Sequence, residues 1–268
     1  MKINEARSKI RNSHFGKKSK KLLNEWINHE SIGGVGMGLF EVPPVIERAK
    51  GSYLYDCEGK EYLDFLSGFS VSALGNNNEE ITKIIIDQSQ KLTHYFDFPH
   101  PERIKLAHKL CDISGIKGKN SVIFGVTGSD AIELAIRVAR YYTGKPYILT
   151  AHGDYHGVTY GTMGLTTKGG MHPYFHPVRP NMDVGYFPFP HPYRKPNDKY
   201  PGYDINSLRI FQQTLEGKET VYTDGLHNIN NVAAILVEPF QSSAGYYIPP
   251  KEYLKILRKI ADRHGMLL

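Results

Sequence analysis

The chain of 268 residues has only two cysteines, Cys57 and Cys111, and no long apolar run. Two cysteines cannot form the disulfide framework of a small secreted protein, and no signal-peptide pattern precedes them. No stretch approaches the ~18 consecutive apolar residues that a membrane-spanning helix requires. These absences predict a protein without membrane contact in the reducing cytoplasm.

Excess charge is confined to one end of the chain. The formal net charge is +6, yet residues 1–21 hold eight of the 33 basic residues and one of the 27 acidic ones, so the other 247 residues sum to −1. A basic arm can bind nucleic acid or an acidic surface. No nucleic-acid motif or basic patch interleaved with aromatics follows it, so the sequence favours a solvated N-terminal segment and no nucleic-acid partner.

The composition and the alternation of expected strands and helices are those of a globular α/β protein. The hydrophobic fraction of 40% and the length predict one large or two unequal domains. A hairpin is expected from Tyr53–Tyr55 and Tyr62–Phe65, turning at Gly59. Helices are expected at about 79–92, 101–113, 129–142 and 251–264, and strands at 122–124, 147–151, 232–237 and from Met266 onward. Buried strands alternating with amphipathic helices predict a mostly parallel sheet with helices on both faces.

Two segments do not fit this alternation of strands and helices. Residues 31–38 form a glycine-rich loop that matches no nucleotide-binding fingerprint, so it is either a flexible connector or the lining of a site entrance. Residues 171–203 contain eight prolines, which exclude a regular helix or a central strand and indicate a long ordered excursion.

The segment Phe124–Ala131 runs from an expected strand through a tight turn, Thr127-Gly128-Ser129, directly into a helix. The free N–H groups and positive dipole end of a helix N-terminus can hold a phosphate, and Gly128 would let the anion approach. A Ser N-cap on an ordinary helix is the simpler alternative.

The segment Ala151–Gly157 places Tyr155 at the carboxyl end of a parallel strand, where an aromatic ring can stack on a flat ligand. His152 and His156 are four residues apart, but a loop with two glycines does not fix that spacing, and neither does Pro173 between His172 and His176. No metal site is therefore expected.

The segment Val237–Gly245 again follows a strand. Glu238 ends a buried strand, where a charge needs a partner, and Gln241 and Ser243 offer polar side chains to the same crevice. An exposed polar loop after the strand is the alternative.

These three loops, together with Glu47–Ser52, Tyr55-Asp56 and Leu63–Gly68, resemble the class III aminotransferases, enzymes that use pyridoxal 5'-phosphate. The resemblance extends from about residue 40 to the end. It implies a fold-type I architecture, with residues 1–70 as an N-terminal arm and part of a small domain and residues 71–268 as the cofactor-binding large domain. It also implies a homodimer.

The resemblance assigns roles to particular positions. Thr127, Gly128 and Ser129 would bind the cofactor phosphate, Tyr155 would stack on the pyridine ring beside His156, and Gln241 would lie near the phenolic oxygen. Phe69, Glu238 and Ser243 would face the substrate. The aspartate that pairs with the ring nitrogen and the Schiff-base lysine would both lie beyond Leu268, so the chain is expected to be C-terminally truncated and inactive alone.

The departures from the family pattern bear on the reaction. The Gln241-Ser242-Ser243-Ala244-Gly245 run is similar to the dialkylglycine decarboxylase branch, but this chain has Phe69 and Tyr155 where that branch has Gln and Trp. Transamination (EC 2.6.1.-) between an amino acid or amine and a 2-oxo acid is therefore the expected activity. A decarboxylating transaminase, an amino-acid racemase and a non-catalytic fragment that binds a phosphorylated ligand are the alternatives.

Overall fold

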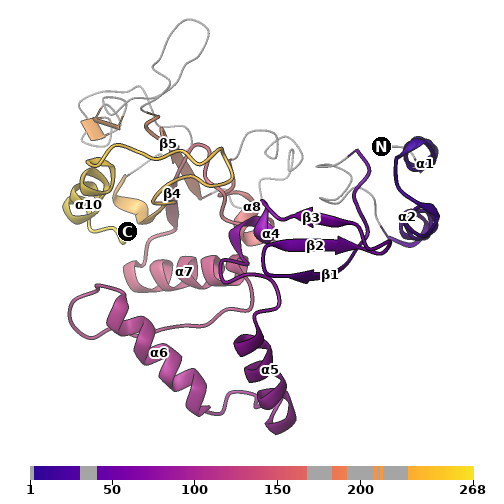
Figure 1. Cartoon of the computed structure of the whole chain (residues 1–268). Helices are drawn as coiled ribbons and strands as arrows, with labels where there is room; N and C mark the ends of the chain where they lie inside the picture. The colour runs from indigo at the N-terminus through magenta and orange to yellow at the C-terminus, as the bar shows by residue number, and fades with distance from the viewer. Residues whose placement is uncertain (1–2, 31–40, 168–182, 192–207, 210–211, 214–228) are drawn as a thin grey trace, which may run out of the picture. The chain divides into compact units, whose positions relative to one another are not determined.

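The computed structural model describes residues 3–30, 41–167, 183–191, 208–209, 212–213 and 229–268 (Figure 1). The chain forms two compact units, Met1–Ile104 and Lys105–Leu268. The predicted domain division at residue 70 concerns the full-length fold and stays a prediction. The glycine-rich loop at 31–38, His172 and His176 lie outside the described residues.

The first unit begins with two helices, α1 (Ile3–Asn12) and α2 (Lys17–His29). Their apolar side chains face each other and form a small core of Ala6, Ile10, Phe15, Leu23 and Ile27, all buried. The expectation of a solvated segment at residues 1–21 is therefore wrong for Ala6, Ile10 and Phe15, because apolar residues recur at helical spacing and pack between the two helices.

A three-stranded antiparallel sheet follows, in the order β1 (Ile46–Lys50), β2 (Tyr53–Asp56) and β3 (Glu61–Leu63). The predicted hairpin is confirmed, with Tyr53 opposite Leu63 and Gly59 at φ +84° in the turn. A positive φ favours glycine, which explains the residue at this corner.

The helices predicted from apolar periodicity are also present as α5 (Glu79–Lys91) and α6 (Pro101–Ile113). Asn78 caps α5 by accepting from the N–H groups of Glu80 and Ile81. Several apolar residues of both helices, such as Ile84 and Ile113, are more than half exposed within the described chain.

The second unit contains the parallel sheet, ordered β5 (Val184–Phe187), β4 (Tyr147–Ala151), β6 (Val232–Leu236). Around it lie α7 (Gly128–Thr143), the short α8 (Tyr160–Met163), the 3₁₀ turn η2 (Ile229–Asn231) and α10 (Tyr253–His264). Leu267 adds one parallel bridge to Ala234, so the strand expected from Met266 is only begun.

Helices cover both faces of this sheet. Ile148 packs in one buried cluster with Ile136 and Ala139 of α7, whereas its neighbour Leu149 packs in another with Leu257 of α10. Successive side chains of a strand point to opposite faces, so α7 and α10 lie on opposite sides. The predicted α/β class with a parallel sheet is confirmed.

One prediction about strands was wrong. Residues 122–124 form no strand, and Ile123 is 61% exposed. A three-residue apolar run cannot specify a pairing partner, and among the described residues no strand pairs with it. The proline-rich segment contains β5, which among the described residues pairs with β4 alone and is therefore an edge strand, consistent with the prediction that the prolines exclude a central strand.

Candidate functional site

The N-terminus of α7 is capped by Thr127, not by a serine. Its Oγ1 accepts from the N–H of Asp130 at 3.1 Å, and the Asp130 carboxylate accepts from the Thr127 N–H at 3.2 Å. This reciprocal capping box starts the helix at Gly128, one residue earlier than the sequence predicted. Among the described residues, no acceptor is recorded for the N–H groups of Gly128 and Ser129.

The space around this helix end fits an anion. A Cβ added at Gly128 would meet nothing within 4 Å, so the first turn opens onto free space. Gly157 lies directly against this turn. A Cβ at position 157 would overlap Ser129 Oγ, and Gly157 itself has φ +119°. Glycine at 157 therefore brings the loop that follows β4 against the first turn of α7.

The loop after β4 is held by a buried carboxylate. Asp154 is fully buried, and its Oδ2 accepts from the Ala151 N–H at 3.3 Å and the Thr150 hydroxyl at 3.5 Å. His156 Nε2 lies 3.4 Å from the same oxygen and 3.0 Å from Thr150 Oγ1. The His156 ring is thus directed into this network, and it is 6% exposed.

Gln241 ties the second predicted loop to the first. It is 2% exposed, and its Nε2 donates to Asp154 Oδ1 and to the His152 carbonyl, each at 2.8 Å. Gly153 makes this approach possible, because a Cβ there would lie 2.7 Å from Gln241 Oε1. A buried charge needs such donors to offset its loss of water.

Tyr155 and Glu238 meet at the open side of this network. The Tyr155 N–H donates to Glu238 Oε2 at 2.9 Å, and the Ser242 N–H donates to Glu238 Oε1 at 3.2 Å. The Glu238 N–H in turn donates to Asp154 Oδ2 at 3.4 Å. The Tyr155 backbone is thus held by Glu238, while the residue as a whole remains 36% exposed.

The structure thus brings together the predicted residues of the second unit: the loops of Tyr155 and Glu238 meet directly, and Gly157 joins the first of them to Ser129. Ser243 is half-buried in the same loop as Glu238. Phe69 belongs to the first unit, in the short helix α4 (Ser67–Ser70), where it is 63% exposed at φ +59°. Non-glycine residues rarely adopt this conformation, and strained backbone concentrates at functional sites.

The sequence interpretation missed Asp154, although it quoted the segment that contains it. A carboxylate between glycines at the end of a buried strand was the available signal, because a buried charge there requires a network. Among the described residues, no three His, Cys, Asp or Glu side chains gather as metal ligands. In the same residues, no helix is long and apolar enough to cross a bilayer.

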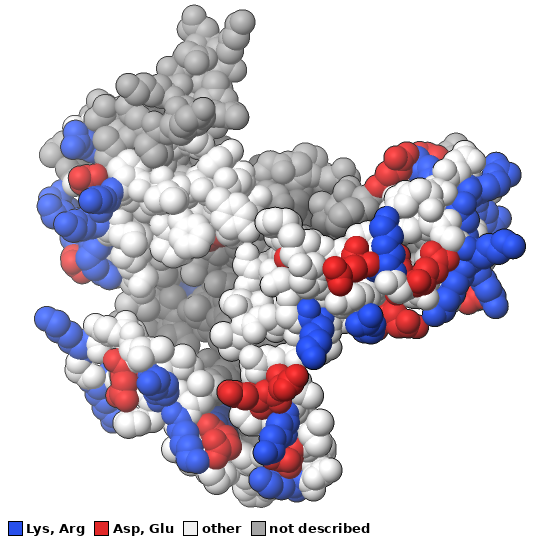
Figure 2. Space-filling view, in the orientation of Figure 1, with Lys and Arg blue, Asp and Glu red and all other residues white. Residues whose placement is uncertain are grey.

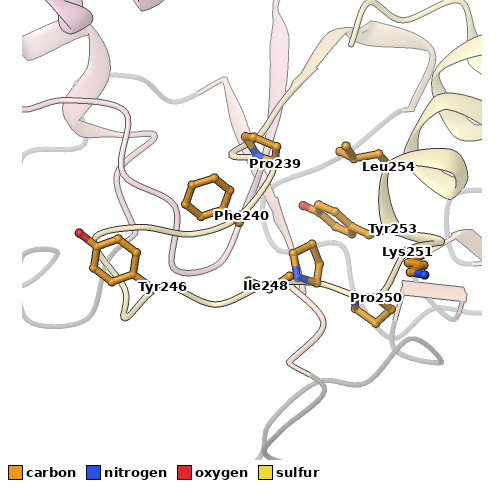
Figure 3. A pocket seen from close by; sticks show the side chains of 9 residues that line it. Pro239, Phe240, Tyr246, Ile248, Pro250, Lys251, Tyr253 and Leu254 are labelled. Carbon is orange, nitrogen blue, oxygen red and sulfur yellow. The ribbon is translucent and has the colours of Figure 1, made fainter. Parts of the chain in front are cut away.

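A pocket of about 370 Å³ adjoins the Glu238–Gln241 loop (Figure 3). Phe240, Ile248 and Leu254 supply part of its apolar wall. Tyr253 also lines it and is fully buried, with its ring centroid 5.0 Å from that of Phe189. Burial raises the pKa of the Tyr253 phenol, and the charges of Asp154 and Glu238 act in the same direction.

The Tyr253 hydroxyl has no hydrogen-bond partner among the described residues. An unsatisfied buried donor costs about 1–3 kcal/mol. We therefore expect Tyr253→Phe to raise the free energy of unfolding by about 1 kcal/mol in urea titrations. Tyr141→Phe, at a side chain that is 94% exposed, should leave it unchanged. A less stable Tyr253→Phe protein would mean that the hydroxyl has an acceptor.

The loops that follow β4 and β6 meet at the carboxyl ends of parallel strands, and Gly157 brings the first of them against the N-terminus of α7. The model of the family described as Aminotransferase class-III matches residues 39–268. The chain belongs to this family. The family and fold expected from the sequence are thereby confirmed, as is pyridoxal phosphate as the family's cofactor.

Curated relatives of this class III chain include racemases as well as aminotransferases. The leucine/methionine racemase of Thermococcus litoralis is 37% identical, with 84% of this chain and 49% of the relative covered. The isoleucine 2-epimerase of Lentilactobacillus buchneri is 35% identical, with 83% and 48% covered. The acetylornithine aminotransferase of Methanocaldococcus jannaschii is 32% identical, with 85% and 50% covered.

Solved structures show the same fold. An amine transaminase from an uncultivated Pseudomonas species, determined with bound pyridoxal phosphate, superposes with a TM-score of 0.74 at 27% identity. The match covers 89% of this chain and 54% of that one. The chain therefore spans about half the length of the relatives and structures that it matches.

Proposed function

We propose that the full-length protein is a pyridoxal-phosphate enzyme that transfers the amino group of an amino acid or amine to a 2-oxo acid. The observation that carries this proposal is the first turn of α7. No described residue accepts from the N–H groups of Gly128 and Ser129, and Gly157 brings the loop of Tyr155 against the same turn.

Each part of the site has a role in this reaction. Gly128 and Ser129 bind the cofactor phosphate through backbone N–H groups, and the Thr127 hydroxyl, which accepts from Asp130, can still donate one bond. The accessible Tyr155 ring would stack on the pyridine ring of the cofactor. When bound, pyridoxal phosphate supplies an electron sink that lets a bond at the substrate's α carbon break.

The buried network contributes to the site by holding its two loops in place. Asp154, His156 and Gln241 fix the two loops to each other, so Tyr155 and Glu238 stay in place when a ligand binds. His156 and Gln241 were assigned to the cofactor from sequence, and Phe69, Glu238 and Ser243 to the substrate. These roles stay proposals, as do the homodimer, the cytoplasmic location and the placement of the catalytic lysine and aspartate beyond Leu268.

Racemisation is a second candidate, favoured by the names of the relatives at 37% and 35% identity. Both reactions break a bond at the α carbon. In transamination the amino group leaves the donor and a 2-oxo acid gains it, whereas in racemisation the α proton returns to the opposite face and no oxo acid is consumed.

One assay separates the candidates. Full-length protein with pyridoxal phosphate is incubated with L-leucine, with and without 2-oxoglutarate, and the products are resolved by chiral chromatography. We expect glutamate to form only when 2-oxoglutarate is present, in amounts equal to the leucine lost. Accumulation of D-leucine without an oxo acid would show that the protein is a racemase and would contradict the proposed transamination.

Further amine donors extend the test beyond leucine. Carbon dioxide release from 2-aminoisobutyrate, without ordinary transamination by any donor, would instead indicate the decarboxylating branch. A protein that binds the cofactor but converts no donor would be a non-catalytic binding module.

A further inference from the structure

A groove of about 620 Å³ between α1 and α2 is lined by six residues whose side chains are all polar or cationic. Its described lining residues are Asn4, Arg7, Ser8, Arg11, Lys20 and Asn24. Figure 2 shows Lys and Arg side chains gathered over these two helices. The family match begins at residue 39, so all the residues that line this groove precede it in the sequence.

Helical spacing explains why these side chains face one another. Residues 4, 7, 8 and 11 share one face of α1, and residues 20 and 24 are one turn apart on α2. The adjacent face of α1 carries Ala6 and Ile10, which pack against Leu23 and Ile27 of α2. The small apolar core thus holds the two polar faces at a fixed separation.

The acidic side chains of these helices are engaged elsewhere. Glu5 pairs with Lys9 at 3.4 Å, and Glu25 pairs with Lys21 at 3.9 Å. Glu30 accepts from the Trp26 indole N–H at 2.7 Å. Among the described residues, no carboxylate is recorded as a partner of the three cations that line the groove, so their positive charge is uncompensated.

Neutral acceptors position two of these cations. Arg7 Nη2 donates to Asn28 Oδ1 at 2.8 Å, and Lys20 Nζ donates to the Arg11 carbonyl at 2.9 Å. Each uses only part of its donor capacity, because a guanidinium has five N–H groups and an ammonium three. Asn24 is held by a 2.8 Å bond to the Lys20 carbonyl.

We propose that this groove binds a small soluble phosphate monoester. Two arginines and a lysine match the charge and acceptor geometry of a phosphate group, and arginine binds it through parallel hydrogen bonds. The groove has the size of sites for organic ligands, which is larger than one inorganic anion needs. Ser8, Asn4 and Asn24 bind the organic part. No aromatic residue is among the described lining residues, which disfavours single-stranded nucleic acid.

The test is isothermal titration of the full-length protein, saturated with pyridoxal phosphate so that the α7 site is filled, with glycerol 3-phosphate at fixed ionic strength. Arg7→Gln/Arg11→Gln removes two charges from the groove, and Lys9→Gln/Lys21→Gln removes two charges from the same helices at their salt-bridged surface. We expect the first pair to weaken binding by about tenfold or more and the second to change it less than about threefold. The α7 site is identical in both variants, so the difference belongs to the groove.

Two measurements guard against misfolding. Trp26 is the only tryptophan of the chain, so its emission reports whether α2 is folded in each variant. Ser8→Asp provides a second test if the arginine variant does not fold. It places a carboxylate in the groove and should abolish binding. The fold should tolerate the change, because Ser8 is only half-buried.

Four results would overturn the proposal. The first is an equal loss of affinity in both double variants, which would indicate nonspecific attraction of the ligand to the positive charge of the helices. The second is no binding of glycerol 3-phosphate to the unaltered protein. The third is binding of a DNA oligonucleotide without binding of the monoester. The fourth is sedimentation with phosphatidic acid vesicles without binding of the free monoester, which would assign the groove to a lipid headgroup.

Discussion

Replacing Gly128 with aspartate should abolish binding of pyridoxal phosphate to the full-length protein. The new carboxylate would occupy the open space before the first turn of α7 and accept the N–H groups that the phosphate needs. Two like charges about 4 Å apart repel by roughly 4 kcal/mol at an effective dielectric constant of about 20. We therefore expect a loss of affinity of more than about a hundredfold, measured by cofactor absorbance after gel filtration.

The matched control is Gly128→Ala. A Cβ at this position meets nothing within 4 Å, and the backbone N–H is unchanged, so the variant should retain the cofactor. An acidic residue in the first turn of a helix is favourable, so Gly128→Asp should also fold. If the aspartate variant folds and keeps the cofactor, the phosphate does not bind at α7.

Replacing Asp154 with alanine should destabilise the second unit by about 3–5 kcal/mol, because several buried donors would lose their acceptor. The recorded donors to its carboxylate are the Ala151 and Glu238 N–H groups, the Thr150 hydroxyl and the Gln241 amide. Tyr155 and Gln241 would lose their fixed positions, so cofactor affinity should fall with stability. Urea unfolding measures the first effect and cofactor titration the second.

Asp262→Ala provides the comparison. Asp262 pairs with Arg258 at 2.6 Å one turn away on α10, and its side chain is 67% exposed. Exposed pairs of this kind contribute less than about 1 kcal/mol. A similar small effect of Asp154→Ala would mean that the buried network does not hold the loops, and that Tyr155 and Glu238 are positioned otherwise.

Much of the fold could be predicted from local sequence. The extents of α5, α6, β4 and α10 follow from apolar periodicity and end signals such as Gly265, which adopts φ +62° after α10. The loop motifs were also visible, because strand ends followed by polar residues mark the ligand edge of a parallel sheet.

Other elements depended on partners that local patterns cannot specify. The apolar run at 122–124 did not become a strand, while β5 formed within a proline-rich segment because β4 offered it an edge. The basic N-terminus folded as two helices because Ile10 and Leu23 could bury each other. For β5 and for the two N-terminal helices, the contact that decides the structure joins residues of different elements. The apolar pattern within one segment therefore does not show it.

The sequence by itself determined the family, the cofactor class and the order of the site loops, since these reside in motifs of a few adjacent residues. Only the tertiary structure decided that Asp154 is the buried centre joining them. Its partner Gln241 lies 87 residues away, and that contact exists only because β4 and β6 are adjacent in the sheet. The cationic groove arises in the same way, because two helices must pack before their polar faces can converge.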